Sequence, residues 1–278
     1  MRKKETRGDC PVCGYANAYT ETITNEGKRI GWCASCQDKE AIAVYLGSGK
    51  IPYSPSKLAA MAQDRAERAA KAKQRAVTIW SGAGWISDFD PAAIYLRSRQ
   101  LGRFTSSPAL RYREDCPHPD GKRYPAMVAQ LVDMYGVFHG VHRTFLTHDG
   151  KKANLVPAKA SLGTMWGCGV RLPQVGWPGW QPTWSAIVVA EGIESAASAG
   201  LLLDLPAIAA VSAGNLASGL ALHRQFKEVM IAADNDKPGL VAAEAAMHRW
   251  QSEGRIVRIM KAAIDGHDFN DVLMGKTS

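Results

Sequence analysis

The chain has 278 residues, of which 46% are hydrophobic and 22% are charged. This composition is typical of a soluble globular protein, and the length suits one large domain or two to three small ones. No apolar run approaches the ~20 residues that cross a bilayer, and no apolar stretch follows the charged residues 1–5, so we expect a cytoplasmic protein with no membrane partner and no secretory signal. The formal net charge of +8 favours an acidic partner such as nucleic acid or a nucleotide, although ordinary solubility explains it equally well.

Cysteines are concentrated near the start of the chain. Four of the six form two Cys-x-x-Cys pairs, at Cys10, Cys13, Cys33 and Cys36. In a reducing cytoplasm such pairs indicate a metal site rather than disulfides. Two tight turns can direct four thiolates at one ion, which matches tetrahedral Zn²⁺ in a closed, structural site. Uncoordinated or redox-active cysteines are the alternative.

Residues 1–47 therefore read as a zinc ribbon, with short strands at 18–24 and 29–32 joined by a turn at 25–28. Positive charge and aromatic rings on a small hairpin suit contact with single-stranded DNA. The residues that could supply them are Arg2, Lys3, Lys4, Arg7, Tyr19, Lys28, Arg29 and Trp32. Each of these alone fits a solvated surface residue or a core aromatic equally well.

The next region mixes helix and strand. Residues 48–82 are expected to form a linker followed by an exposed helix over 57–80, with Ser56 as its N-cap. Residues 83–183 are expected to form a mixed α+β domain. It begins with a helix at Pro91 and continues with strands at 126–132 and 137–146.

From residue 184 to the end, short apolar runs alternate with helical patterns. The strands are expected at 186–190, 207–211, 228–233 and 255–260, and the helices at 193–203, 216–226 and 240–253. An alternation of this kind predicts a parallel sheet with helices on its faces. Residues 184–278 are therefore expected to be a separate α/β domain.

Acidic residues follow three of these strands. They are Glu191 after the first, Asp234 and Asp236 after the third, and Asp268 and Asp271 after the fourth. The carboxyl ends of parallel strands share one edge, where ligands bind. Carboxylates brought together there repel one another unless a cation such as Mg²⁺ or Mn²⁺ binds them. A bound metal of this kind can polarise a phosphoryl group.

The segments Glu191-Gly192 and Asp234-Asn235-Asp236 resemble the two motifs of the Toprim family. Asp268-Phe269-Asn270-Asp271 resembles the late acidic group of its primases. The resemblance implies a Rossmann-like parallel sheet, with Glu191 as general acid or base, Asp234 and Asp236 as metal ligands, and Asp268 or Asp271 completing the site. Replicative bacterial primases usually carry Asp where this chain has Ser195, with Glu194 one residue earlier, so the number of catalytic metals stays open.

The order of zinc ribbon, basic mixed domain and Toprim domain is similar to that of bacterial, phage and mobile-element primases. Residues 142–163 resemble the region just before the Toprim domain in the mobile-element enzymes, where a basic ridge guides template and nucleotide. That resemblance makes Arg143, Lys152 and Lys159 candidates for binding nucleic acid or substrate. Ordinary surface charge is the alternative for each.

The function implied is that of a DNA primase, a DNA-directed RNA polymerase that makes short RNA primers on a single-stranded DNA template by metal-dependent nucleotidyl transfer. Nucleoside triphosphates would be its substrates. The sequence has no Walker A motif, so a separate replicative helicase is the expected partner. The alternatives are a Toprim nuclease, a topoisomerase, and a non-catalytic zinc and Toprim accessory protein of recombination or replication.

Overall fold

The computed structural model describes residues 4–12, 18–24, 27, 29–34, 38–48, 55–173, 181 and 183–276. The chain forms two compact units, Met1–Ala69 and Ala70–Ser278. Within the described ranges, no helix combines the length and the apolar character that a membrane span needs.

The first unit contains a three-stranded antiparallel sheet in the order β1-β2-β3. Its strands are β1 (Lys4–Gly8), β2 (Tyr19–Ile23) and β3 (Arg29–Cys33), and helix α1 (Lys39–Ser48) follows. The two predicted strands are present, whereas β1 and α1 were not foreseen. A small core joins the sheet to the helix through Cys10, Val12, Tyr19, Cys33, Ala41 and Ile42.

Helix α2 (Pro55–Ser81) begins earlier than expected. Ser56 lies inside its first turn and is not the N-cap, because Pro55 already has the backbone geometry that suits a first helical position. The last turns of the helix belong to the second unit. There Ala76 and Ile79 pack with the buried side chains of a four-stranded sheet.

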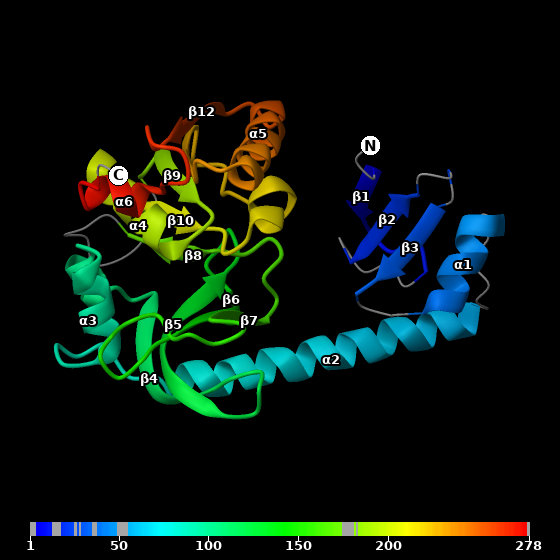
Figure 1. Cartoon of the computed structure of the whole chain (residues 1–278), viewed down its shortest axis with the longest axis horizontal. Helices are drawn as coiled ribbons and strands as arrows, with labels where there is room; N and C mark the ends of the chain where they lie inside the picture. The colour runs from blue at the N-terminus through cyan, green and yellow to red at the C-terminus, as the bar shows by residue number, and fades with distance from the viewer. Residues whose placement is uncertain are drawn as a thin grey trace. The chain divides into compact units, whose positions relative to one another are not determined.

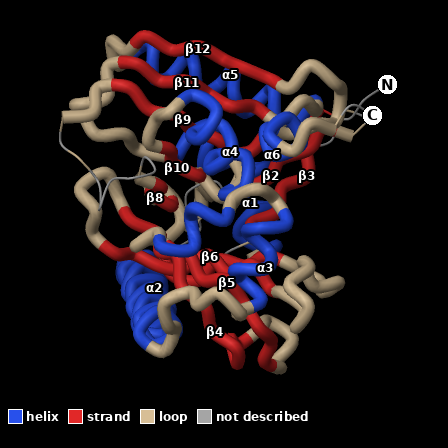
Figure 2. The backbone as a smooth tube through the Cα atoms, turned by 90° about the vertical axis from the view of Figure 1, so that its left-hand side faces the viewer, coloured by secondary structure: helices blue, strands red, loops and turns tan. Residues whose placement is uncertain are grey.

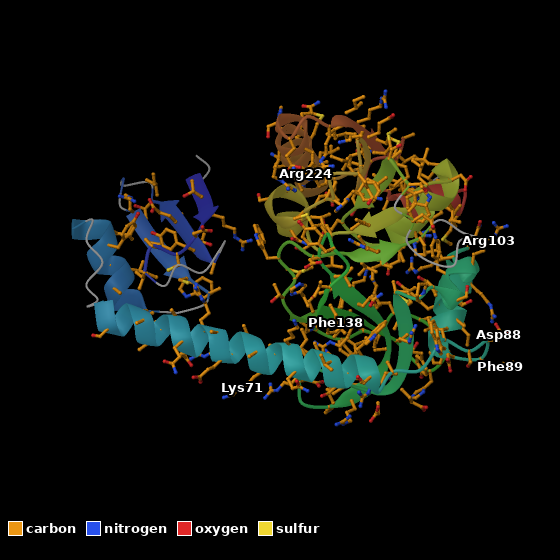
Figure 3. All side chains as sticks on the ribbon, turned by 180° about the vertical axis from the view of Figure 1, so that it is seen from behind. Lys71, Asp88, Phe89, Arg103, Phe138 and Arg224 are labelled. Atoms are coloured by element: carbon orange, nitrogen blue, oxygen red, sulfur yellow. The ribbon has the colours of Figure 1, made fainter. Side chains whose placement is uncertain are left out.

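That sheet is antiparallel, in the order β4-β5-β6-β7. Its strands are β4 (Leu110–Pro117), β5 (Arg123–Val132), β6 (Phe138–Phe145) and β7 (Lys159–Gly163). The strands predicted at 126–132 and 137–146 are present as β5 and β6, whereas β4 and β7 were not foreseen. On the face toward α2, the ring of Phe138 lies 6.4 Å from that of Trp80 (Figure 3).

The opposite face of this sheet is covered by α3 (Pro91–Ser98) and η1 (Gly102–Ser106). Side chains on β5 alternate, as a strand with two buried faces requires. Val128 packs toward α2, whereas Met127 and Leu131 enter a larger core with Tyr95 and Phe104. The helix predicted to begin at Pro91 is therefore present.

The second sheet of this unit has the order β12-β11-β9-β10-β8 (Figure 2). Its strands are β8 (Val170–Leu172), β9 (Ala186–Ala190), β10 (Ala207–Ala209), β11 (Glu228–Ala233) and β12 (Ile256–Lys261). The last four are parallel, as predicted, and β8 pairs antiparallel with β10. β8 comes from before the domain boundary expected at 183–184 and was not foreseen.

Helices cover both faces of this parallel sheet (Figure 1). They are α4 (Ile193–Leu203), α5 (Lys237–Ser252) and the short α6 (Phe269–Leu273). On β9, Val188 and Ala190 pack into the core that contains α4 and the four-stranded sheet, whereas Val189 points to the opposite core, which contains Trp250 of α5. Burial on both faces accounts for the nearly continuous apolar runs in these strands.

The helix predicted over residues 216–226 is wrong. Only a π-helical turn, η2 (Asn215–Gly219), forms there. Two arginines bind the carbonyl groups that a helix would have used: Arg249 donates to the carbonyls of residues 216, 217 and 220, and Arg255 donates to those of 222, 223 and 226. The segment thus satisfies its backbone groups without a helix.

Candidate acidic site

Glu191 and Asp234 lie at the same edge of the parallel sheet. Glu191 is the first residue after β9, and Asp234 is the first after β11. These two strands are direct neighbours, with Ala190 opposite Ala232. The residues that follow them therefore emerge side by side at the carboxyl edge, where open α/β sheets bind ligands.

Asp236 follows closely as the N-cap of α5. Its Oδ1 accepts a hydrogen bond from the backbone N–H of Gly239 at 2.7 Å. Asp236 is exposed, whereas Asp234 is half-buried. The tight turn from β11 into α5 thus presents two carboxylates in different surroundings.

Asp268 and Asp271 form a capping box at the start of α6. Asp268 Oδ1 accepts from the backbone N–H of Asp271 at 2.9 Å, and Asp271 Oδ2 accepts from that of Asp268 at 3.2 Å. Asp271 also accepts a hydrogen bond from Lys276, which lowers the pKa of its carboxyl group. Asp271 is therefore occupied by its own helix and by Lys276, and Asp268 is the better candidate for the shared site.

Electrostatics links the four remaining carboxylates. Burial, followed by the negative charges of Asp268, Glu191 and Asp236, raises the pKa of Asp234 to about 6. The pKa of Glu191 is also raised, first by burial and then by the charge of Asp236. The structure thus brings Glu191, Asp236 and Asp268 close enough to Asp234 for their negative charges to disfavour its ionisation.

Ser195 stands at the position where the resemblance to primases led us to expect an aspartate. Its hydroxyl group donates to Asp234 Oδ1 at 3.2 Å. This hydrogen bond favours the charged form of Asp234 and opposes the burial that raises its pKa. The serine therefore supports an existing carboxylate instead of adding one more negative charge.

Asn235, between the two aspartates, was not singled out from the sequence. Its side chain is buried, and Nδ2 donates to the carbonyl of Ala262 at 2.9 Å and to Asp265 Oδ1 at 3.1 Å. Its backbone N–H donates to the carbonyl of His267, and its carbonyl accepts from the N–H of Gly266. Asn235 thus fastens the loop that leads to Asp268 onto the turn that carries Asp234.

The residues at this edge suit a hard divalent cation by their chemistry. All four are carboxylates, the oxygen ligands that Mg²⁺ prefers, and a cation would offset both the burial of Asp234 and the neighbouring negative charges that raise its pKa. Within the described part of the chain, no three His, Cys, Asp or Glu side chains are grouped tightly enough to hold one ion.

The three basic candidates lie in different environments. Lys152 is exposed. The Nζ of Lys159 donates to Glu194 Oε2 at 2.9 Å, and its side chain is 33% exposed. Arg143, however, is buried, with NH1 donating to the carbonyl of Pro117 and Nε to that of Ala160.

The expectation that Arg143 contacts nucleic acid does not fit this position. Its guanidinium group binds the protein backbone, and burial lowers its pKa. Alternation along β6 explains the result, because residues 143 and 145 lie on the face that packs against α2. From the sequence alone, an arginine between a histidine and a threonine could not be distinguished from a surface cation.

Of the four cysteines predicted to bind zinc, Cys10 and Cys33 are buried together in the core of the first unit. Cys13 and Cys36 lie outside the described residues. The remaining two cysteines, Cys116 and Cys168, are buried, and burial raises the pKa of each thiol to about 11.

Comparison with known families places the acidic site in a defined domain. Residues 186–278, which span β9 to α6, match the family profile described as the Toprim domain. This part of the chain is a Toprim domain. Residues 70–172 match a domain of unknown function, DUF7146. The Toprim domain thus contains every carboxylate of the candidate site, and the DUF7146 segment contains Lys152 and Lys159.

Solved structures similar to this chain include two primases. The primase fragment of the bacteriophage T7 primase-helicase protein is 16% identical, with a TM-score of 0.44, over 99% of this chain and 96% of that one. The Aquifex aeolicus primase, with its zinc-binding and RNA polymerase domains, is 13% identical, with a TM-score of 0.46, over 99% of this chain and 78% of that one. A comparison with curated protein sequences gave no match.

Proposed function

We propose that this protein is a DNA primase that makes short RNA primers on single-stranded DNA by metal-dependent nucleotidyl transfer. The observation that carries the proposal is the convergence of Glu191, Asp234, Asp236 and Asp268 at the carboxyl edge of the Toprim sheet. The N-terminal unit adds two buried cysteines from the two Cys-x-x-Cys pairs. A zinc ribbon built on these pairs would stand ahead of the Toprim domain, in the order that the sequence resemblance to primases implies.

The chemistry would join two nucleotides. The 3′-hydroxyl oxygen of the primer forms a bond to the α-phosphorus of the incoming nucleoside triphosphate, and the bond from that phosphorus to pyrophosphate breaks. Asp234, Asp236 and Asp268 would hold Mg²⁺ or Mn²⁺, which when bound polarises the phosphoryl oxygens. Glu191, whose pKa burial raises, would take the proton of the attacking hydroxyl group.

Cations beside the acidic edge would hold the phosphates of the substrates. Lys159 lies close enough to Glu191 to lower its pKa, and Lys152 is exposed on the segment just before β7. In the first unit, Trp32 is 47% exposed on β3, which suits stacking on an unpaired base. Cys10, Cys13, Cys33 and Cys36 would hold a structural Zn²⁺, and a separate replicative helicase would supply the template.

Primer synthesis tests this function directly. The purified protein is incubated with a single-stranded DNA template, labelled ribonucleotides and Mg²⁺, and the products are separated by length. We expect short labelled RNA from the wild type, at least about a hundredfold less from Asp234→Ala, and a normal yield from the exposed control Glu114→Ala. Cleavage of the template without synthesis would favour the nuclease, and DNA binding without either reaction would favour the accessory protein.

A further inference from the structure

Glu194 is a buried carboxylate that the proposed reaction does not use. It lies in the first turn of α4 and is 5% exposed. Its Oε1 accepts a hydrogen bond from the hydroxyl group of Tyr95 at 2.5 Å, and its Oε2 accepts from Lys159 Nζ at 2.9 Å. The three side chains come from α4, α3 and β7, so this contact joins the Toprim domain to the preceding segment.

The charge state of this group follows from its partners. Burial raises the pKa of Glu194, but Lys159 and Tyr95 outweigh that effect, and the pKa lies well below its ordinary value. Burial and the nearby negative charge raise the pKa of Tyr95, so its hydroxyl group stays a donor. A buried carboxylate without such partners would be costly, so the contacts with Lys159 and Tyr95 stabilise the charged form of Glu194.

The side chain of Lys159 is partly exposed to solvent, although its partner Glu194 is buried. The Lys159 side chain is 33% exposed, whereas that of Glu194 is 7% exposed. An ammonium group has three donors, and Glu194 accepts one of them. The positive charge of Lys159 also lowers the pKa of Glu191, so the same ammonium group lies within electrostatic reach of the candidate acidic site.

We infer that Glu194 is a positioning residue, which holds the Lys159 ammonium group beside Glu191 with its remaining donors directed at a substrate phosphate. The hydroxyl group of Tyr95 donates to the other oxygen of the Glu194 carboxylate and so fixes the orientation of that carboxylate. This inference rests on the proposed function, because it assigns the phosphate to the nucleotide or the template of that reaction. Fixing a long, flexible lysine in advance removes an ordering cost from substrate binding.

A first measurement tests the pairing without any need for activity. The protein is treated with an amine-acetylating reagent at neutral pH, and the rate at Lys159 is compared by mass spectrometry with the rate at exposed Lys152 in the same molecule. Glu194→Gln should raise that ratio about tenfold, since the ammonium group is then no longer held by the ion pair with the buried carboxylate. Tyr95→Phe should raise it less. An unchanged ratio in Glu194→Gln would overturn the inference.

A second measurement tests the role in binding. We expect Glu194→Gln to raise the KM for the nucleotide, or the Kd for a single-stranded oligonucleotide, about tenfold with kcat changed less than threefold. A rise in KM identifies the triphosphate as the ligand, and a rise in Kd identifies the template. In a Lys159→Gln background, Glu194→Gln should cause no further rise in KM or Kd, because the two residues act as one unit.

A merely structural role for Glu194 gives a different pattern. Glu194→Gln would then lower the folded fraction and the maximal rate, leave KM and Kd unchanged, and add its full effect to that of Lys159→Gln; this pattern would overturn the inference. If Glu194→Gln does not fold, Tyr95→Phe carries the same measurements with one hydrogen bond removed. A wild type that makes no primers would contradict the proposed function alone, since the acetylation ratio still tests the pairing.

Discussion

The hydroxyl group of Ser195 lies 3.2 Å from Oδ1 of Asp234 and donates a hydrogen bond to it. This contact is made at the position where the resemblance to primases led us to expect an aspartate. Ser195 is buried, so any charge placed there would act on Asp234 through a medium of low polarity. The number of negative charges at the sheet edge is therefore sensitive to this one residue.

Ser195→Asp should make the protein depend more strongly on divalent cations. In EDTA the added buried carboxylate should lower the free energy of unfolding by about 2 kcal/mol or more, because it repels Asp234 and loses its hydration. Saturating Mg²⁺ should restore much of that loss and raise Tm more than it does in the wild type. Thermal unfolding with and without Mg²⁺ measures both, with Ser195→Ala as the uncharged control. Equal Mg²⁺-induced shifts in Tm for the two variants would contradict a cation site at this edge.

Substitution of Asn235 should release the loop that carries Asp268. Asn235→Ala removes one buried and one partly buried hydrogen bond and should lower the free energy of unfolding by about 2 kcal/mol. Asn235→Asp should cost more despite its equal size, because a carboxylate would face the carbonyl of Ala262 and the carboxylate of Asp265. Urea unfolding checks the order of the two variants. The exposed control Asn154→Ala should stay within about 0.5 kcal/mol of the wild type.

His142 should make the second unit sensitive to mild acid. Burial, followed by the charge of Lys159, lowers the pKa of this histidine to about 4 from its ordinary 6.5. Between those values the unfolded chain binds a proton that the folded protein does not, so the free energy of unfolding rises with pH across that window. The loss between pH 6.5 and pH 4 should reach about 3 kcal/mol.

Urea unfolding at a series of pH values measures this effect. In His142→Asn the free energy of unfolding should change much less between pH 6.5 and pH 4 than it does in the wild type. The exposed control His148→Asn should show the same pH dependence as the wild type. A wild type and a His142→Asn variant with parallel curves across that window would show that His142 is charged in the folded protein.

Zinc should be required by the first unit and not by the second. The core of the first unit is small and contains Cys10 and Cys33, and a core of that size is rarely stable without a metal or another cross-link. We expect one zinc ion for each chain by elemental analysis, its loss in Cys33→Ser, and its retention in Cys168→Ala. Limited proteolysis of the zinc-free protein should digest residues 1–69 and spare 70–278. Resistance of both segments would contradict a structural zinc site.

The position of the acidic residues could be predicted because it depends on local pattern. Glu191 and Asp234 each follow a short apolar run, and parallel strands bring their carboxyl ends to one edge. The assignment of Asp271 was less secure, because a capping residue and a metal ligand are the same side chain in sequence. Only the hydrogen bonds of α6 show that Asp271 caps its own helix.

Features that depend on distant partners could not be predicted. The segment 216–226 has helical composition, but Arg249 and Arg255 bind its carbonyl groups from residues that follow it in the chain. Glu194 was noted from the sequence only as a neighbour of the missing aspartate. Its partners Tyr95 and Lys159 lie far from it along the chain, and no local sequence pattern predicts these contacts.

The short strand β8 lies within the DUF7146 match in sequence, but in the structure it belongs to the sheet of the Toprim domain. Val170–Leu172 is hydrogen-bonded along β10 and forms the border strand of the Toprim sheet. A fragment beginning at residue 184 would leave the backbone of β10 bare, and a bare strand invites pairing with a second molecule. The boundary between the two matched segments is therefore a poor place to divide this protein. Substitutions in β8 should destabilise the Toprim sheet, although β8 precedes the Toprim match in sequence.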